Sequence, residues 1–204
     1  IAAGVARVVI ACEDAFQREG GAVERMRAAG IEVVSGLMRE DARELNIGFF
    51  SRVERGRPFL RLKLAASLDG RIALASGASK WITGEAARAD VQRWRARSSA
   101  ILTGSGTALA DDPRLTVRLA DTDVVPPLRV LLDRELRLPR SANLLADGAA
   151  PTLVFHADRI DAPADSASLV QHLGVAEGEY GLDLAAVLAV LARRGVNELL
   201  AECG

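Results

Sequence analysis

Short runs of consecutive apolar residues recur along the chain, and most are rich in Val, Ile and Leu. Such runs are typical of strands that are covered on both faces, as in a parallel sheet. They lie at Arg7–Cys12, Ile31–Ser35, Phe59–Ala66, Ala100–Thr103, Leu128–Asp133, Thr152–Phe155 and Asn197–Cys203. A further short strand is expected at Arg71–Ala75, after the turn-forming sequence Ser67–Gly70.

Helical periodicity separates several of these runs. Apolar residues at steps of three and four predict one amphipathic helix. They are Ala42, Leu45, Phe49 and Val53. Thr83 is suited to cap a helix that continues to about Arg97, and Asp183 opens another helix over Leu184–Arg194. Alternating strands and helices predict an α/β fold with a mostly parallel sheet.

Two segments interrupt this pattern. Ser51–Pro58 is charged, poor in apolar residues and ends in Gly and Pro, so we expect it to separate two units, residues 1–56 and 57–204. Asp158–Gly181 is rich in Ala, Asp, Gly and Ser and has weak periodicity. A loop-rich surface excursion is expected there.

The composition limits the classes of function. The 204 residues, 50% of them apolar, are enough to bury two compact cores. The 26 basic residues nearly balance the 27 acidic ones, which gives no electrostatic reason to expect a nucleic acid or a membrane surface as partner. The apolar runs are far shorter than the about 20 residues of a membrane span.

Cysteine usage and the two ends add two expectations. Cys12 and Cys203 cannot make a disulfide framework, which fits a reducing cytoplasm. The chain has no initiating Met, and Ala201–Gly204 reads as a strand that runs into a glycine turn. We therefore expect that both ends are cut, or that the chain is part of a longer protein.

Three polar clusters, each at the end of an apolar run, carry the chemistry of the chain. They are Pro58–Ala73, Ser79–Thr83 and Asp111–Arg118. In this order and at this spacing they resemble the reductase domain of the bifunctional deaminase/reductase enzymes of riboflavin biosynthesis. The resemblance implies a dihydrofolate-reductase-like domain that uses NADPH to reduce 5-amino-6-(5-phosphoribosylamino)uracil to its ribitylamino product. It further implies a cytoplasmic homo-oligomer.

The same resemblance assigns ligand-binding positions. It places Ala65, Trp81, Thr107, Asp111 and Gly204 on the cofactor. It places Ser79, Arg95, Leu115, Arg118 and Glu202 on the substrate. Hydride transfer mainly requires proximity and orientation, so no general acid or base is assigned.

The residues themselves leave plainer alternatives open. Ser67–Gly70 also suits a tight turn, Trp81 a core or hinge aromatic, and Asp111–Pro113 a helix stop. Most arginines around Arg95 suit a solvated helix face. Thr103–Thr107 resembles a dinucleotide fingerprint only in part. Leu109 occupies the third glycine position, and no βαβ unit with an acidic residue about 20 positions further on is evident. A flexible glycine turn is expected there instead.

Position 134 departs from the family, whose members often carry a small hydroxyl residue there against the adenosine end of the cofactor. Arg134 suits a 2′-phosphate, but it suits solvent equally well. The preference for NADP over NAD therefore rests on the resemblance alone.

Residues 1–56 resemble the C-terminal part of the partner deaminase domain, whose zinc ligands are not in this chain. His156-Ala157-Asp158 imitates a deaminase motif only superficially, so no metal site is expected, and His156 and His172 are expected at the surface or at strand ends. Zinc and deamination would belong to a segment upstream of Ile1. Two other classes stay open: a reductase of the same fold for another pteridine or pyrimidine, and a non-catalytic ligand-binding module.

Overall fold

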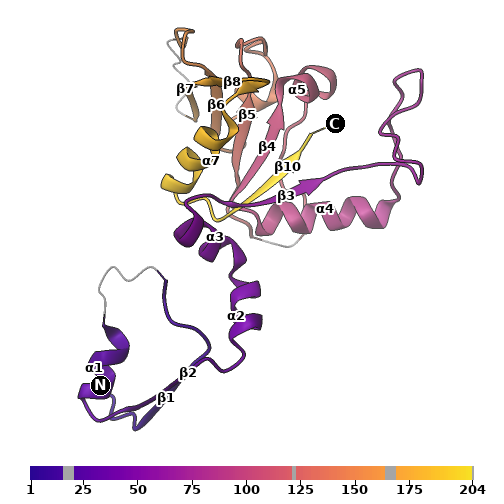
Figure 1. Ribbon diagram of the computed structural model, residues 1–204. Coiled ribbons are helices and arrows are strands. Elements are labelled where there is room, and N and C mark those ends of the chain that lie inside the picture. The colour runs from indigo at the N-terminus through magenta and orange to yellow at the C-terminus, as the bar shows by residue number, and fades with distance from the viewer. Residues whose placement is uncertain (16–20, 121–122, 164–168, 204) are drawn as a thin grey trace.

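Six parallel strands form the main sheet in the part of the chain that the computed structural model describes, residues 1–15, 21–120, 123–163 and 169–203. Their order across the sheet is β3 (Phe59–Lys63), β10 (Glu198–Glu202), β4 (Ala100–Gly104), β5 (Leu128–Leu132), β6 (Thr152–Ala157) and β7 (Val170–Val175). Each neighbouring pair is parallel, which confirms the predicted α/β class (Figure 1).

Both faces of the sheet interior are covered, which is why the interior strands β10, β4, β5 and β6 are mostly apolar at consecutive positions. On one face α7 (Leu184–Arg193) packs Val187 and Leu191 on the strands. On the other face lie α4 (Glu85–Arg97), α5 (Ser105–Asp111) and the short α6 (Asn143–Ala146). The interior strand positions divide between two cores. Ala100, Leu102, Val130, Leu153, Phe155, Leu199 and Ala201 belong to the first, and Ile101, Leu131 and Val154 to the second.

The helix starts confirm one predicted cap and correct another. The Asp183 carboxylate accepts hydrogen bonds from the amides of Ala185 (2.8 Å) and Ala186 (3.1 Å) and so caps α7 as expected. The predicted cap of α4 is wrong, because Gly84 occupies the cap position without a side-chain bond. The Thr83 carbonyl instead accepts a bond from the Arg88 guanidinium at 2.5 Å.

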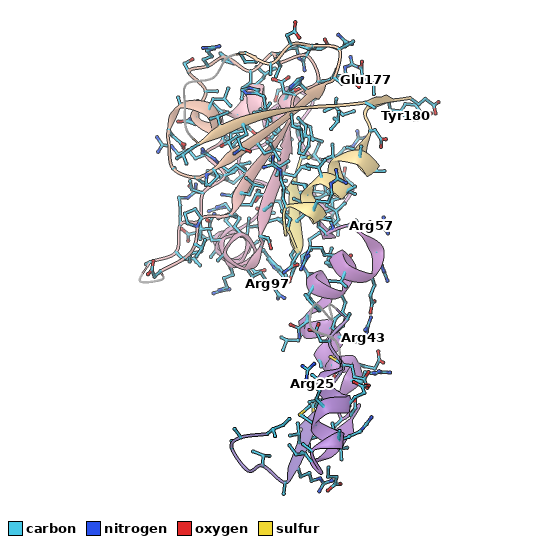
Figure 2. The ribbon with its side chains drawn as sticks, turned by 90° about the vertical axis from the view of Figure 1, so that its left-hand side faces the viewer. Arg25, Arg43, Arg57, Arg97, Glu177 and Tyr180 are labelled. Atoms are coloured by element: carbon cyan, nitrogen blue, oxygen red, sulfur yellow. The ribbon has the colours of Figure 1, made fainter. Side chains whose placement is uncertain are left out.

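The N-terminal residues form a separate small layer. The parallel strands β1 (Arg7–Ile10) and β2 (Glu32–Ser35) pair with each other, beside α1 (Ala22–Ala28). Two helices, α2 (Arg39–Leu45) and α3 (Ile47–Arg55), connect this layer to the main sheet. Figure 2 shows the layer extending away from the sheet, with Arg25 on α1, Arg43 on the connecting helix α2 and Arg57 at the junction.

Two predicted elements around the sheet are wrong. The single helix expected across Ala42–Val53 is broken at Asn46, whose side-chain amide donates to the Ala42 carbonyl (2.9 Å) and competes with the helical backbone pattern. The segment Ser51–Pro58 contains the end of α3, which continues to Arg55, and its role as a boundary between two units stays a prediction. The strand expected at Arg71–Ala75 is absent from the described residues, where turns and bends replace it.

The segment Asp158–Gly181 is also more regular than its composition predicts. It contains β7 and the strand β8 (Glu177–Gly178), which pairs with β9 (Gly181–Leu182) in a hairpin. Because β7 is an edge strand whose four central positions are exposed or only partly buried, it lacks a continuous apolar run. Tyr180, 92% exposed, marks the tip of the hairpin (Figure 2).

The glycine-containing turn after β4 is tighter than expected. Strand β4 ends at Gly104, and α5 begins at the next residue. The parallel strands β4 and β5 are therefore joined by a connection that contains a helix, which the sequence pattern did not reveal. No described helix has the length and apolarity needed to cross a membrane.

Gly48 fixes the contact between α3 and the main sheet. A Cβ added there would lie 2.8 Å from the Asn197 carbonyl oxygen and 2.6 Å from Cγ of Glu198. The Arg52 guanidinium also donates to the Asn197 side chain at 2.6 Å. Helix α3 therefore approaches the start of β10 at backbone distance.

We predict that Gly48→Ala lowers the free energy of unfolding by about 1–3 kcal/mol, because the added methyl group forces the backbone of α3 and the start of β10 apart. Urea denaturation measures the loss. Gly106→Ala is the matched control: its Cβ would meet nothing within 4 Å, so stability should be unchanged or rise. Equal effects of the two changes would contradict the close contact.

Candidate active site

The carboxyl ends of β3, β10 and β4 meet at one edge of the sheet (Figure 1). Glu202, the last residue of β10, is paired in register with Lys63, the last residue of β3. On the other side, the Thr103 hydroxyl donates to the Glu202 carbonyl oxygen at 2.9 Å. Ligands of open parallel sheets bind beyond this edge, so Glu202 lies at the expected place for a site.

Arg95 and Glu202 form a bidentate ion pair in the interior of this edge. Nε and Nη2 of Arg95 donate to the two carboxylate oxygens at 2.6 and 2.8 Å, and both side chains are at least 90% buried. Planar guanidinium and carboxylate groups match each other in this geometry. The paired bonds that we expected Arg95 to offer a substrate are thus made to Glu202, and its substrate role stays a prediction.

The remaining donor of Arg95 reaches the segment that carries Leu115 and Arg118. Its Nη1 donates to the Thr116 carbonyl at 2.9 Å, and the Arg118 amide donates to the Gln92 side chain at 2.9 Å. Leu115 is buried and has a positive φ of 48°. Four predicted substrate residues therefore gather around one helix.

The signal for Gln92 was present in the sequence but was not recognised. Arg88, Gln92 and Arg95 follow one another at steps of four and three, so they share one face of α4. This face is turned toward the site, whereas Arg93 on the same helix is exposed and pairs with Asp90. Most of the helix is solvated as expected.

The predicted cofactor residues lie around the neighbouring loops. Lys80 pairs with Asp111 at 3.8 Å, which brings the Ser79–Thr83 cluster to the end of α5. The Trp81 ring is 72% exposed, and the Arg88 guanidinium lies 4.7 Å from its centre. Trp81 is therefore not a core aromatic.

The other predicted positions are less defined by contacts. Ser79 is exposed, Ala65 is half-buried just after β3, and Thr107 is half-buried in α5. Gly204 lies outside the described residues. Asp111 ends α5 and Asp112 has a positive φ of 41°, so the expected helix stop is present.

Cys203 follows Glu202 at the same edge. Burial raises the pKa of its thiol, and the negative charge of Glu202 acts in the same direction, although a hydrogen bond with the Gly104 backbone opposes both. The thiol therefore stays protonated at neutral pH and is a poor nucleophile.

Three further expectations concern residues outside the centre of the site. His156 is buried rather than at the surface, and its Nδ1 lies 2.9 Å from the Ala157 carbonyl oxygen. Among the described residues no group of His, Cys, Asp or Glu is arranged to hold a metal ion. Arg134 forms ion pairs with Glu135 (3.1 Å) and Glu177 (3.7 Å), and its side chain is half-exposed.

The protein-family comparison matches residues 58–204 to the RibD C-terminal domain. This chain belongs to that family. It is 43% identical over 203 residues to the riboflavin biosynthesis protein RibD of Bacillus amyloliquefaciens, covering 98% of this chain and 54% of that protein. The RibD of Escherichia coli is 39% identical over 216 residues, with 100% of this chain and 58% of that protein covered. The chain thus spans little more than half the length of these relatives.

Solved structures agree with this membership. RibD of Acinetobacter baumannii matches with a TM-score of 0.85 and 40% identity, over 100% of this chain and 56% of that one. A diaminohydroxyphosphoribosylaminopyrimidine deaminase/5-amino-6-(5-phosphoribosylamino)uracil reductase of Thermotoga maritima matches with a TM-score of 0.84 and 34% identity, over 100% and 55%. The riboflavin biosynthesis reductase Rib7 of Saccharomyces cerevisiae, at 18% identity and a TM-score of 0.57 over 80% and 72%, shares the fold.

We predict that Arg95→Met lowers the free energy of unfolding by about 3–5 kcal/mol, because it leaves the Glu202 carboxylate buried without a counter-charge. Chemical denaturation measures the loss. Arg93→Met, on the exposed face of the same helix, should change stability by no more than about 0.5 kcal/mol. The double change Arg95→Met with Glu202→Leu should recover most of the loss, and no recovery would contradict the ion-pair origin.

Proposed function

We propose that this chain is the reductase part of a bifunctional riboflavin biosynthesis enzyme. It would use NADPH to reduce the ribosyl group of 5-amino-6-(5-phosphoribosylamino)uracil to a ribityl group. The observation that carries the proposal is the gathering of Arg95, Glu202 and the Leu115–Arg118 segment at the carboxyl edge of a parallel sheet, in a member of the RibD C-terminal domain family.

The charges at this edge favour an anionic substrate. Because Arg95 is neutralised by Glu202, the substrate phosphate requires another cation. Arg118 is exposed and has no ion-pair partner among the described residues, and Lys63 ends the strand beside Glu202. A guanidinium offers a phosphate two parallel hydrogen bonds, so Arg118 would hold the phosphate, with Lys63 adding positive potential.

The buried ion pair would orient the rest of the substrate. Arg95 fixes both carboxylate oxygens of Glu202, so this carboxylate has one defined direction at the sheet edge. A carboxylate held in this way accepts hydrogen bonds from hydroxyl or amino groups of a ribosylaminopyrimidine without having to reorganise. Ser79 and Leu115 would complete the substrate side.

The residues around the edge also fit a nicotinamide cofactor. Arg88 covers one face of the exposed Trp81 ring, which leaves the other face for a flat heterocycle. At Gly104 and Gly106 an added Cβ would meet nothing within 4 Å, so this turn is open to a ligand. We assign Ala65, Trp81, Thr107 and Asp111 to the cofactor. NADPH, when bound, supplies the hydride that reaches C1′ of the opened sugar.

The protein's part in the reaction is mainly positional. Holding two reactants in a near-attack geometry supplies a large share of the rate of such a transfer. The Lys80–Asp111 contact would help by linking the Ser79–Thr83 cluster to α5. No side chain is assigned as a general acid or base.

We further propose two units, residues 1–56 and 57–204, of which the first belongs to a zinc-dependent pyrimidine deaminase. The family match begins at residue 58, and β1 and β2 pair only with each other among the described strands. Zinc would be bound by a part of the full-length protein outside this chain. The enzyme would act in the cytoplasm as a homo-oligomer.

Arg118→Ala tests the phosphate assignment. We expect the KM for the ribosylaminopyrimidine phosphate to rise at least about tenfold, since a charge-assisted hydrogen bond is lost, while the Kd of NADPH changes by less than about twofold. Steady-state kinetics and quenching of Trp81 fluorescence by NADPH measure the two quantities. Arg114→Ala, an exposed arginine of the same segment, is the control.

The wild-type protein decides between the proposed substrate and its rivals. Turnover of the ribosylaminopyrimidine phosphate without turnover of dihydrofolate supports the proposal. Activity on dihydrofolate alone would indicate a reductase for another substrate. Quenching by NADPH without any turnover would indicate a ligand-binding module.

A further inference from the structure

The segment from Asp112 to Arg118 is held by side chains rather than by a neighbouring strand. The carbonyl oxygens of Asp112, Arg114 and Thr116 accept hydrogen bonds from three different side chains. The donors are Asn143 Nδ2 (3.0 Å), Arg129 Nη1 (3.3 Å) and Arg95 Nη1 (2.9 Å). Three side-chain donors thus satisfy carbonyl groups that a neighbouring strand would otherwise pair.

Two of the three donors also bind groups outside this segment. Arg95 belongs to the ion pair with Glu202. Arg129 is 99% buried and also binds Asp147 (2.7 Å), the Ala150 carbonyl (2.8 Å) and the Thr152 hydroxyl (2.9 Å). Arg129 therefore stabilises the fold of the β5–β6 region.

Asn143, by contrast, is directed almost wholly at Asp112. Its backbone amide donates to Oδ1 of Asp112 at 2.8 Å, and its side-chain amide donates to Oδ2 at 2.7 Å as well as to the carbonyl. Three hydrogen bonds thus join one residue of α6 to one residue at the start of the segment. Neither residue is buried, so the loss of these hydrogen bonds does not leave a polar group without a partner in the core.

These three hydrogen bonds, the Asn143–Asp112 clamp, lie where the backbone conformation is unfavourable. Asp112 and Leu115 both have positive φ values, 41° and 48°, which cost energy for residues other than glycine. Such conformations persist only where the surroundings fix them, and they are frequent at functional sites. Asn143 holds the first of these two residues in place.

We propose that Asn143 is a positioning residue for the substrate side of the site. Through Asp112 it sets the direction in which the segment leaves α5 and so the places of Leu115 and Arg118. This inference rests on the proposed function, because it takes Arg118 as the group that holds the substrate phosphate. Asn143 itself does not touch the substrate.

Asn143→Ala in the full-length protein tests the proposal. We expect the KM for the ribosylaminopyrimidine phosphate to rise about tenfold, as for the loss of hydrogen bonds to a charged group, while kcat changes less than about threefold and the Kd of NADPH less than about twofold. Amide hydrogen exchange should become faster across residues 112–118. Asn46→Ala, which removes an exposed asparagine contact at the break between α2 and α3, is the matched control.

A charge variant supplies a readout that a merely structural role would not give. Asn143→Asp places a second carboxylate against Asp112, so the KM relative to wild type should be raised at neutral pH. Two carboxylates at this distance share a proton readily, so the ratio should fall toward one as the pH is lowered to about 5.

The swap Asp112→Asn with Asn143→Asp should restore the KM to within about threefold of wild type. The carboxamide introduced at position 112 can accept from the backbone amide of residue 143 and donate to the new carboxylate, which re-forms two of the three hydrogen bonds.

The outcomes separate the two proposals. No turnover by the wild-type protein would overturn the proposed function. Normal turnover by wild type together with an unchanged KM in Asn143→Ala would overturn the role of Asn143 alone. Equal losses in kcat, substrate KM and NADPH binding, without rescue by the swap, would also overturn it, since they indicate general damage.

Discussion

The buried ion pair between Arg95 and Glu202 is the contact on which the arrangement of the site depends. It joins the last turns of α4 to the end of β10, and its third donor reaches the Leu115–Arg118 segment. Two charges can stay in a low-dielectric interior only if their hydrogen bonds are fully satisfied, which allows little freedom of geometry. Helix, strand and segment must therefore take up their positions together.

The sequence pattern predicted best the strands that are buried on both faces. The interior strands β4, β5, β6 and β10 are covered on both faces, so their residues are apolar at successive positions. Strand β7 was not predicted, because an edge position tolerates the polar residues Gln171 and His172, which interrupt the apolar run. The break at Asn46 was missed for a different reason: apolar spacing continues through it, and a single side-chain hydrogen bond decides the outcome.

The resemblance assigned residues to the candidate site, but it did not predict the contacts among them. Resemblance to a family selects residues such as Arg95 and Glu202 without stating that they bind each other across 107 positions of sequence. The pairing depends on β10 lying between β3 and β4, which is a property of the topology. The clamp on Asp112 was equally hidden, since Asn143 lies in a helix of a single turn with no periodic signal.

The place of β10 in the sheet has a consequence for synthesis on the ribosome. Strands β3 and β4 are direct neighbours in sequence order among the strands of the sheet, yet they do not pair, because β10 lies between them. Strand β10 is made about 95 residues after β4 and about 135 residues after β3. Until Glu198–Glu202 leaves the exit tunnel, both retain unpaired backbone edges and uncovered apolar side chains. In that interval the nascent chain is more exposed to aggregation than a sheet whose neighbouring strands are made in succession.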